Sequence, residues 1–133
     1  MAAQTRGMRN NNPLNIRRGE KWQGLKAKQE DSSFAQFISL EWGIRAAFCI
    51  LKTYMNKYGY QNVASIIKRW APATENDTQK YINIVYAKTG IPPYHKISFH
   101  DKTKMCLLVQ AMAYVENGCM LDLLTIEKGY DLV

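Results

Sequence analysis

The chain has 133 residues, 47% of them apolar and 22% charged, which suits a single domain spanning residues 1–133 and excludes intrinsic disorder. Eighteen Lys and Arg against eleven Asp and Glu give a net charge of +7; this favours an anionic partner, although surplus charge can also serve solubility alone. No stretch approaches the roughly 18 apolar residues of a membrane span, and no apolar signal segment opens the sequence, so we expect neither.

Residues 9–18, RNNNPLNIRR, lack regular apolar spacing and predict a loop. Asparagine side chains compete for backbone hydrogen bonds, and Pro13 restricts the preceding residue to extended or turn backbone. Leu14 and Ile16 are suited to anchor this loop in a core, whereas a disordered leader is the other interpretation. In an ordered loop the amides of residues 10–12 could bind carbohydrate, and carboxylates would be attracted by Arg9, Arg17 and Arg18.

The segment from Trp22 to Ser39 shows short alternation of apolar and polar residues, as in SSFAQFIS, which predicts a small β-hairpin. A helix follows from Ser39, its expected cap, to Gly59, which should end it. Apolar residues recur along it at helical spacing: Ile44, Phe48, Leu51, Met55 and Tyr58.

Four further helices are predicted after Gly59. Each is followed by the residue that we expect to end it. The four ranges and their terminating residues are 62–70 and Pro72, 76–89 and Gly90, 101–117 and Gly118, and 120–129 and Gly129. In the second of these four the residues expected to face inward are Tyr81, Ile82, Val85 and Tyr86. The fold class is therefore α+β, mostly helical, with about five helices and a small β-hairpin.

Cys49, Cys106 and Cys119 are odd in number and lack metal-type spacing, so we expect buried free thiols formed in a reducing compartment. His95 and His100 have no partner at ligand spacing. No Ser, Cys or His set suggests nucleophilic catalysis, and no glycine-rich phosphate loop is present. We therefore expect neither a metal nor a cofactor.

Glu116 continues the helical stripe of Met105, Val109 and Met112, which places a carboxyl on the core-facing side. Burial and the negative end of the helix dipole both raise the pKa of such a carboxyl. An acid that stays protonated near neutral pH can protonate the leaving oxygen of a glycosidic bond. The alternative is that the stripe ends at Val115 and that Glu116 is a solvated residue on a fraying turn.

The segment RWAPATENDT is a second candidate site, because Trp70 could supply an aromatic wall beside Glu75 and Asp77. Its other interpretation is a helix start, with Thr74 or Asn76 as the cap and Asp77 in the first turn. The two roles are compatible.

A mixture of aromatic and basic residues near position 55 could suit single-stranded nucleic acid. It comprises Tyr54, Tyr58, Tyr60, Lys52 and Lys57. We interpret the set as a core rim beside a solvated face, because no nucleic-acid motif accompanies it, and we do not expect nucleic acid as a partner.

Four segments resemble a group of phage and prophage virion structural proteins with a lysozyme-like domain: RGMRNNNPLNIRRGEKWQG, FAQFISLEWGIRAAFCILKTY, IIKRWAPATENDTQKYINIV and AMAYVENG. The order of the first segments is also similar to that of bacterial autolysin glucosaminidases, in which a helix ending in a catalytic Glu precedes such a loop. Here the matching acid comes last, which implies a circularly permuted lysozyme-like domain.

The resemblance implies roles for particular residues. Glu116 matches the general acid, and the loop that frames the cleft is matched by Asn11, Asn12 and Asn15. The group's own signature is matched by Trp70, Glu75, Asn76 and Thr78, which we expect to bind substrate. The group usually has glycine where this chain has Leu14, which puts the backbone geometry of the loop in question.

Two functions follow: a phage-associated peptidoglycan-cleaving muramidase or lytic transglycosylase, or a non-catalytic virion structural or cell-wall-binding protein on the same fold. The expected partners are peptidoglycan or another anionic cell-wall polymer and virion components. We expect a monomer that is made in the bacterial cytoplasm without a signal peptide, and is then virion-associated or released to the wall. The permutation also predicts Asn11, Asn12 or Asn15 within roughly 3–6 Å of Glu116.

Overall fold

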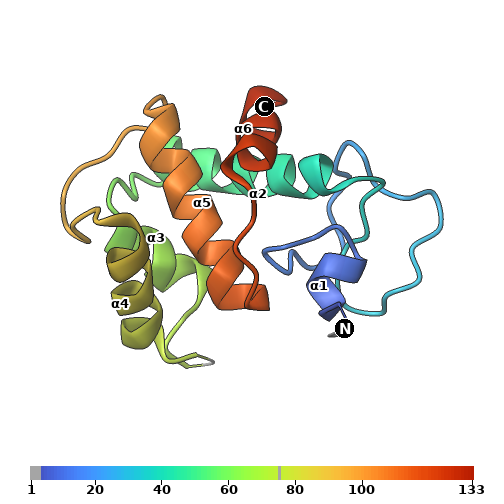
Figure 1. Cartoon of the computed structure of the whole chain (residues 1–133), viewed down its shortest axis with the longest axis horizontal. Coiled ribbons are helices and arrows are strands. Elements are labelled where there is room, and N and C mark those ends of the chain that lie inside the picture. The colour runs from blue at the N-terminus through green and yellow to red at the C-terminus, as the bar shows by residue number, and fades with distance from the viewer. Residues whose placement is uncertain (1–3, 75) are drawn as a thin grey trace.

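The structure is a computed structural model that describes residues 4–74 and 76–133. Six helices form within these ranges: α1 (Arg6–Arg9), α2 (Leu40–Asn56), α3 (Val63–Trp70), α4 (Thr78–Thr89), α5 (Lys102–Asn117) and α6 (Leu123–Asp131). α6 packs on α2, α4 packs on α5, and α1 lies near the end of α5 beside the long N-terminal loop (Figure 1). Within the described ranges, no helix is long and apolar enough to cross a membrane.

The predicted β-hairpin is wrong, and with it the α+β class. The two described ranges contain no strand, and the region shows only two isolated antiparallel bridges, Arg17 with Phe34 and Leu25 with Phe37. The protein is mostly helical, as the apolar spacing predicted, with an irregular N-terminal region in place of a sheet.

Side chains take some of the backbone hydrogen bonds that a hairpin would have used, while isolated backbone pairs form elsewhere, such as the Lys26 amide with the Gln36 carbonyl at 2.9 Å. The Ser33 and Phe34 amides both donate to Asp31 Oδ1 at 2.9 Å, and the Gln36 amide donates to Gln29 Oε1 at 2.8 Å. These local side-chain bonds offer the backbone an alternative to a ladder. The alternating sequence therefore forms a partly buried extended segment that is paired only at isolated bridges and not as a continuous strand ladder.

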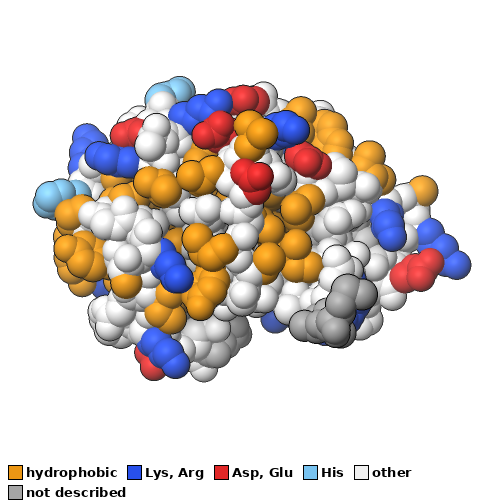
Figure 2. All heavy atoms as spheres, in the orientation of Figure 1, with side chains coloured by type: hydrophobic (Ala, Val, Ile, Leu, Met, Phe, Trp, Pro, Cys, Tyr) orange, Lys and Arg blue, Asp and Glu red, His pale blue; other side chains and the backbone are white. Residues whose placement is uncertain are grey.

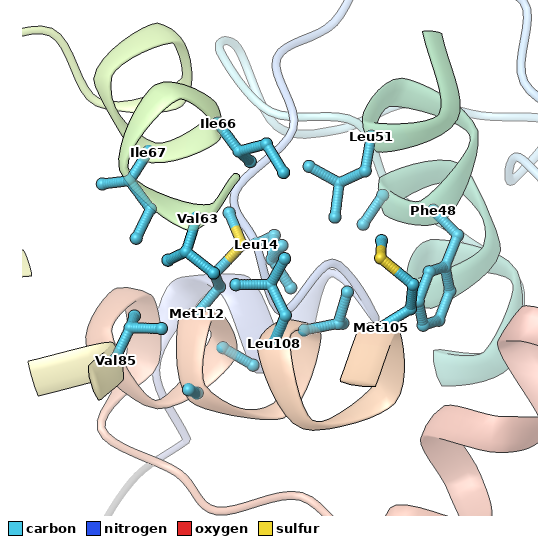
Figure 3. Packing of buried hydrophobic residues seen from close by; sticks show 14 of the residues in the cluster. Leu14, Phe48, Leu51, Val63, Ile66, Ile67, Val85, Met105, Leu108 and Met112 are labelled. Carbon is cyan, nitrogen blue, oxygen red and sulfur yellow. The ribbon is translucent and has the colours of Figure 1, made fainter. Parts of the chain in front are cut away.

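The core lies between α2, α3 and α5, and the N-terminal loop contributes to it through Leu14 (Figure 3). Leu14 is 1% exposed and Ile16 is 6% exposed, so both predicted anchors are confirmed. Full burial of a leucine stabilises by about 1.5–3 kcal/mol, which is enough to hold a short loop against the helices. Leu14 is not among the residues with positive φ, so its presence in place of glycine causes no backbone strain.

The irregular N-terminal region, which precedes α2, contains one helix that the sequence did not predict. Thr5 caps α1, and its Oγ1 accepts a hydrogen bond from the Met8 amide. Asn11 and Asn15 then adopt left-handed backbone, each with φ of 53°. Asparagine is one of the few non-glycine residues that tolerate this conformation, so the asparagine run builds a tight loop.

Two of the four predicted terminal glycines are confirmed, because Gly90 and Gly118 end α4 and α5 with φ of 70° and 68°. α2 instead ends at Asn56, before Gly59, and α6 continues past Gly129. A Cβ at Gly129 would overlap the Ile44 side chain, so this glycine serves the contact between α6 and α2.

Three further expectations need correction. Tyr58 and Tyr86, predicted to face inward, are 54% and 47% exposed. The cysteines are free, but Cys106 is buried whereas Cys49 and Cys119 are only partly so. The cap of α4 is Asp77, which accepts a hydrogen bond from the Lys80 amide at 3.0 Å, and not Thr74 or Asn76.

Candidate active-site cleft

A cleft of about 580 Å³ lies where the N-terminal loop meets the helices. The surface is notched below the end of α5, between the side that carries α4 and the side that carries α1 (Figure 2). The residues lining the cleft are Leu14, Asn15, Ile16, Arg17, Phe34, Ile50, Tyr54, Trp70, Ala71, Asn76 and Glu116. Distant parts of the chain thus meet in one concave site, as small-ligand sites commonly require.

Glu116 is the one carboxylate among the described residues that line this cleft. It lies in the last turn of α5, half-buried, and accepts a hydrogen bond from Asn15 Nδ2 at 3.3 Å on Oε1. Burial raises the pKa of the Glu116 carboxyl above its ordinary value, and Asn15 and Tyr81 act in the opposite direction. The predicted proximity of the loop to Glu116 is therefore confirmed, through Asn15.

Tyr81, which the sequence suggested only as a core residue, does not line the cleft but lies next to Glu116 from the neighbouring side of α4. It is 5% exposed on α4, and its hydroxyl lies beside the Glu116 carboxyl without a regular hydrogen bond to any residue in the described ranges. Burial, followed by the negative charge of Glu116, raises the pKa of the Tyr81 hydroxyl, which therefore stays protonated and can donate to the carboxylate. Helical spacing predicts that Tyr81 faces inward, but it does not predict that its hydroxyl meets Glu116.

Asn117, next to the acid, fastens the N-terminal segment to the end of α5. Its Oδ1 accepts from Thr5 Oγ1 at 2.7 Å, and its Nδ2 donates to the Pro13 carbonyl. Gly7 lies under this contact, and a Cβ there would overlap the side chains of Asn15 and Asn117. Because Asn117 holds Pro13, two residues before Asn15, this contact keeps the Asn15 side chain within hydrogen-bond distance of Glu116.

Asn11 and Asn12 support the loop and do not line the cleft. Asn11 Nδ2 donates to the Phe37 carbonyl at 3.0 Å. Asn12 is fully buried; its Nδ2 donates to the Ile16 and Ala35 carbonyls, and its Oδ1 accepts from the Ile16 amide. These hydrogen bonds all go to backbone groups, so the two side chains act on the site by holding the loop in place.

The four residues of the RWAPATENDT signature have different locations. Trp70 and Asn76 line the cleft, Trp70 half-buried and Asn76 exposed. Thr78 is buried and donates to the Ala71 carbonyl, which ties the start of α4 to the end of α3. Glu75 lies outside the described residues.

Three aromatic residues line the same cleft as the acid. Trp70 and Tyr54 meet edge to face with ring centroids 6.3 Å apart. Phe34 joins the lining from the irregular segment that precedes α2. Aromatic rings beside amides form a surface that sugar rings stack on and hydrogen-bond to. Trp70 was predicted; Tyr54 and Phe34 were missed, because their chain segments meet Trp70 only in the folded protein.

Comparison with known proteins places the chain in a phage family. No protein-family model matches it. The chain is 46% identical over 117 residues to Protein P5 of Pseudoalteromonas phage PM2, and the match covers 85% of this chain and 71% of that protein. Identity at this level over most of both chains shows common descent, and the chain therefore belongs to the family of Protein P5, a family of phage proteins.

Proposed function

We propose that this phage-family protein cleaves glycosidic bonds of peptidoglycan, as a muramidase or a lytic transglycosylase, with Glu116 as the general acid. The observation that carries the proposal is the half-buried Glu116 carboxyl, with its raised pKa, in a cleft lined by aromatic and amide side chains. A carboxyl with a raised pKa keeps its proton closer to neutral pH than an ordinary glutamate. The similarity to bacterial autolysin glucosaminidases supports the same role.

In this mechanism the protonated Glu116 gives its proton to the leaving sugar oxygen as the bond to the anomeric carbon breaks. Asn15 holds the carboxyl from one side, and Tyr81 lies where its hydroxyl can donate to the carboxylate that forms. The sugar ring stacks on the aromatic residues Trp70 and Tyr54. Such proton transfer contributes roughly 10²–10⁴-fold to the rate.

The second step follows one of two routes. Water attacks the anomeric carbon in a muramidase, whereas a hydroxyl of the same sugar attacks it in a transglycosylase, which leaves an anhydro product. In the transglycosylase route the Glu116 carboxylate left by the first step takes the proton of the attacking hydroxyl, which returns the acid to its starting form. Glu116 is the one carboxylate in the described lining, and a single acid suffices for the second route. Glu75 is the further carboxylate to test as a base for the first route. Mass spectrometry of the released fragments separates the routes, because the anhydro product lacks one water.

Membership in a phage family supports action on the wall of a bacterial host, by a protein carried in the virion or released to the wall. We propose that residues 1–133 form a single domain and that it acts as a monomer. A second candidate is a non-catalytic virion structural or wall-binding protein. It is favoured by the net charge of +7, which suits adhesion to an anionic polymer without chemistry.

A lysis assay on purified peptidoglycan tests the proposal. Wild-type protein should release soluble fragments, and Glu116→Gln should lower the rate by roughly 10²-fold or more while the fold is retained. Glu20→Gln, which removes an exposed carboxylate that does not line the cleft, is the matched control and should lyse like wild type. Wild-type protein that binds the wall but releases nothing would establish the non-catalytic candidate instead. Full activity of Glu116→Gln together with loss of activity in Glu75→Gln would move the acid to Glu75.

A further inference from the structure

The structure separates the three arginines that flank the asparagine loop. Arg9 Nη1 donates to the Gln4 carbonyl at 2.7 Å, and Arg18 Nη1 donates to the Asp31 carbonyl at 2.9 Å. Arg17 lines the cleft and is the one cationic residue among the described residues that do so. A charge in the cleft can act on a bound ligand, whereas the other two guanidinium groups are engaged by the backbone.

Arg17 is held in position by backbone and ring contacts. An isolated antiparallel bridge joins it to Phe34, and the neighbouring Arg18 amide donates to the Ser33 carbonyl at 3.0 Å. The Arg17 guanidinium carbon lies 5.5 Å from the centroid of the Phe34 ring. A guanidinium held over a ring loses less conformational freedom on binding a ligand than a free one.

A second guanidinium, that of Arg6, lies over the same Phe34 ring, but it differs from Arg17 in being ion-paired. Arg6 lies 4.7 Å from the Phe34 centroid, and its Nε and Nη2 donate to the Asp31 carboxylate at 2.7 and 2.6 Å. Asp31 therefore neutralises Arg6. Arg17 makes no ion pair within the described ranges, so its charge is available to a ligand.

Arg17 is also not paired with the acid. No ion pair joins Arg17 to Glu116 within the described ranges, and the side chains that lower the pKa of Glu116 are Asn15 and Tyr81. A direct ion pair would favour the charged carboxylate and weaken Glu116 as an acid. The cleft thus holds a proton donor and a separate cation.

We propose that Arg17 binds a carboxylate of the glycan in the cleft, so that the ligand is an acidic, muramic-acid-containing strand and not a neutral N-acetylglucosamine polymer. The planar guanidinium suits bidentate binding of a carboxylate. The proposal deepens the proposed function and rests on the glycan site described there. The carboxylate has two sources in peptidoglycan: the lactyl group of a peptide-free strand, or the stem peptide that replaces it.

Binding in the Glu116→Gln background tests this without cleavage. The probes, of equal sugar length, are a neutral chitin oligosaccharide, a peptide-free muramic-acid oligosaccharide, the same oligosaccharide with its lactyl groups amidated, and one that carries stem peptides. We expect calorimetry to show roughly tenfold or tighter binding of a carboxylate-bearing probe over chitin, since hydrogen bonds between charged groups are the strongest class. Preference for the peptide-free strand identifies the lactyl carboxylate, and preference for the peptide-bearing strand identifies the stem.

Arg17→Gln should abolish that preference while affinity for chitin changes less than about twofold, and Arg17→Lys should keep part of it because charge remains without the planar fork. Lys21→Gln removes one exposed charge that does not line the cleft and should leave the preference intact. Equal affinity for all probes, or equal losses in Arg17→Gln and Lys21→Gln, would overturn the proposal. Neither of these two binding results decides whether the protein cleaves peptidoglycan, which the lysis assay tests separately. Conversely, a wild-type protein that binds acidic strands but does not lyse the wall refutes only the catalytic proposal.

Discussion

Replacing Asn117 by alanine should loosen the N-terminal loop and alter the acid beside it. The change removes the acceptor for Thr5 Oγ1 and the donor to the part-buried Pro13 carbonyl. The exposed Thr5 bond contributes little, whereas an unpaired, partly buried carbonyl costs about 1–3 kcal/mol, so we expect a loss of roughly 1.5–3 kcal/mol in the free energy of unfolding. For a chain of this size that corresponds to a fall in Tm of roughly 5–15 °C.

The same substitution should raise the pKa of Glu116. Asn117 and Asn15 pack together over Gly7, so loss of one side chain frees the other to leave Glu116 Oε1. The hydrogen bond from Asn15 favours the charged carboxylate, and its loss favours the protonated form. The alkaline limb of the lysis pH profile should therefore move to higher pH while kcat falls, because the acid is less well positioned.

Two measurements check this reasoning: urea unfolding, and an NMR titration of the Glu116 carboxyl carbon. Asn83→Ala is the control, since it removes an exposed asparagine whose Oδ1, among the described residues, accepts only from Gln79 Nε2, and it should change stability by less than about 0.5 kcal/mol. An Asn117→Ala protein with wild-type stability and an unshifted Glu116 titration would show that other contacts hold the loop against α5.

Two further predictions concern stability. The folded-state pKa of Glu116 is raised, so the stabilisation from its protonated form is complete below the unfolded-state pKa and is lost as the pH rises through the folded-state value. Glu116→Gln should therefore match wild type in acid and exceed it at neutral pH in urea unfolding; the opposite order would contradict the burial of this carboxyl. Asn12→Ala leaves three buried hydrogen bonds unmade and should cost roughly 2–4 kcal/mol by the same measurement. A cost below 1 kcal/mol would refute its role in the loop.

The sequence by itself predicted the five helices α2 to α6, though not α1 or the ends of α2 and α6, because most helix signals are local. Asp101 caps α5 by accepting from the Lys104 amide at 3.1 Å, and glycines with positive φ end α4 and α5. The apolar stripe of α5 predicted a partly buried Glu116, which the structure has at that position. Caps, terminal glycines and helical spacing act within a few residues, so they can be interpreted before the fold is known.

Only the tertiary structure decided the N-terminal region and the lining of the cleft. Alternation in residues 22–39 predicted strands, but such alternation reports half-burial and does not say whether backbone amides meet a strand or a side chain such as Asp31. Gly129 resembles a helix terminator until Ile44 is placed against it. Asn15 and Glu116 lie 101 positions apart in the chain, and Arg17 is distinguished from Arg9 and Arg18 only by the cleft that it lines. These choices depend on contacts between distant segments, which no local propensity encodes.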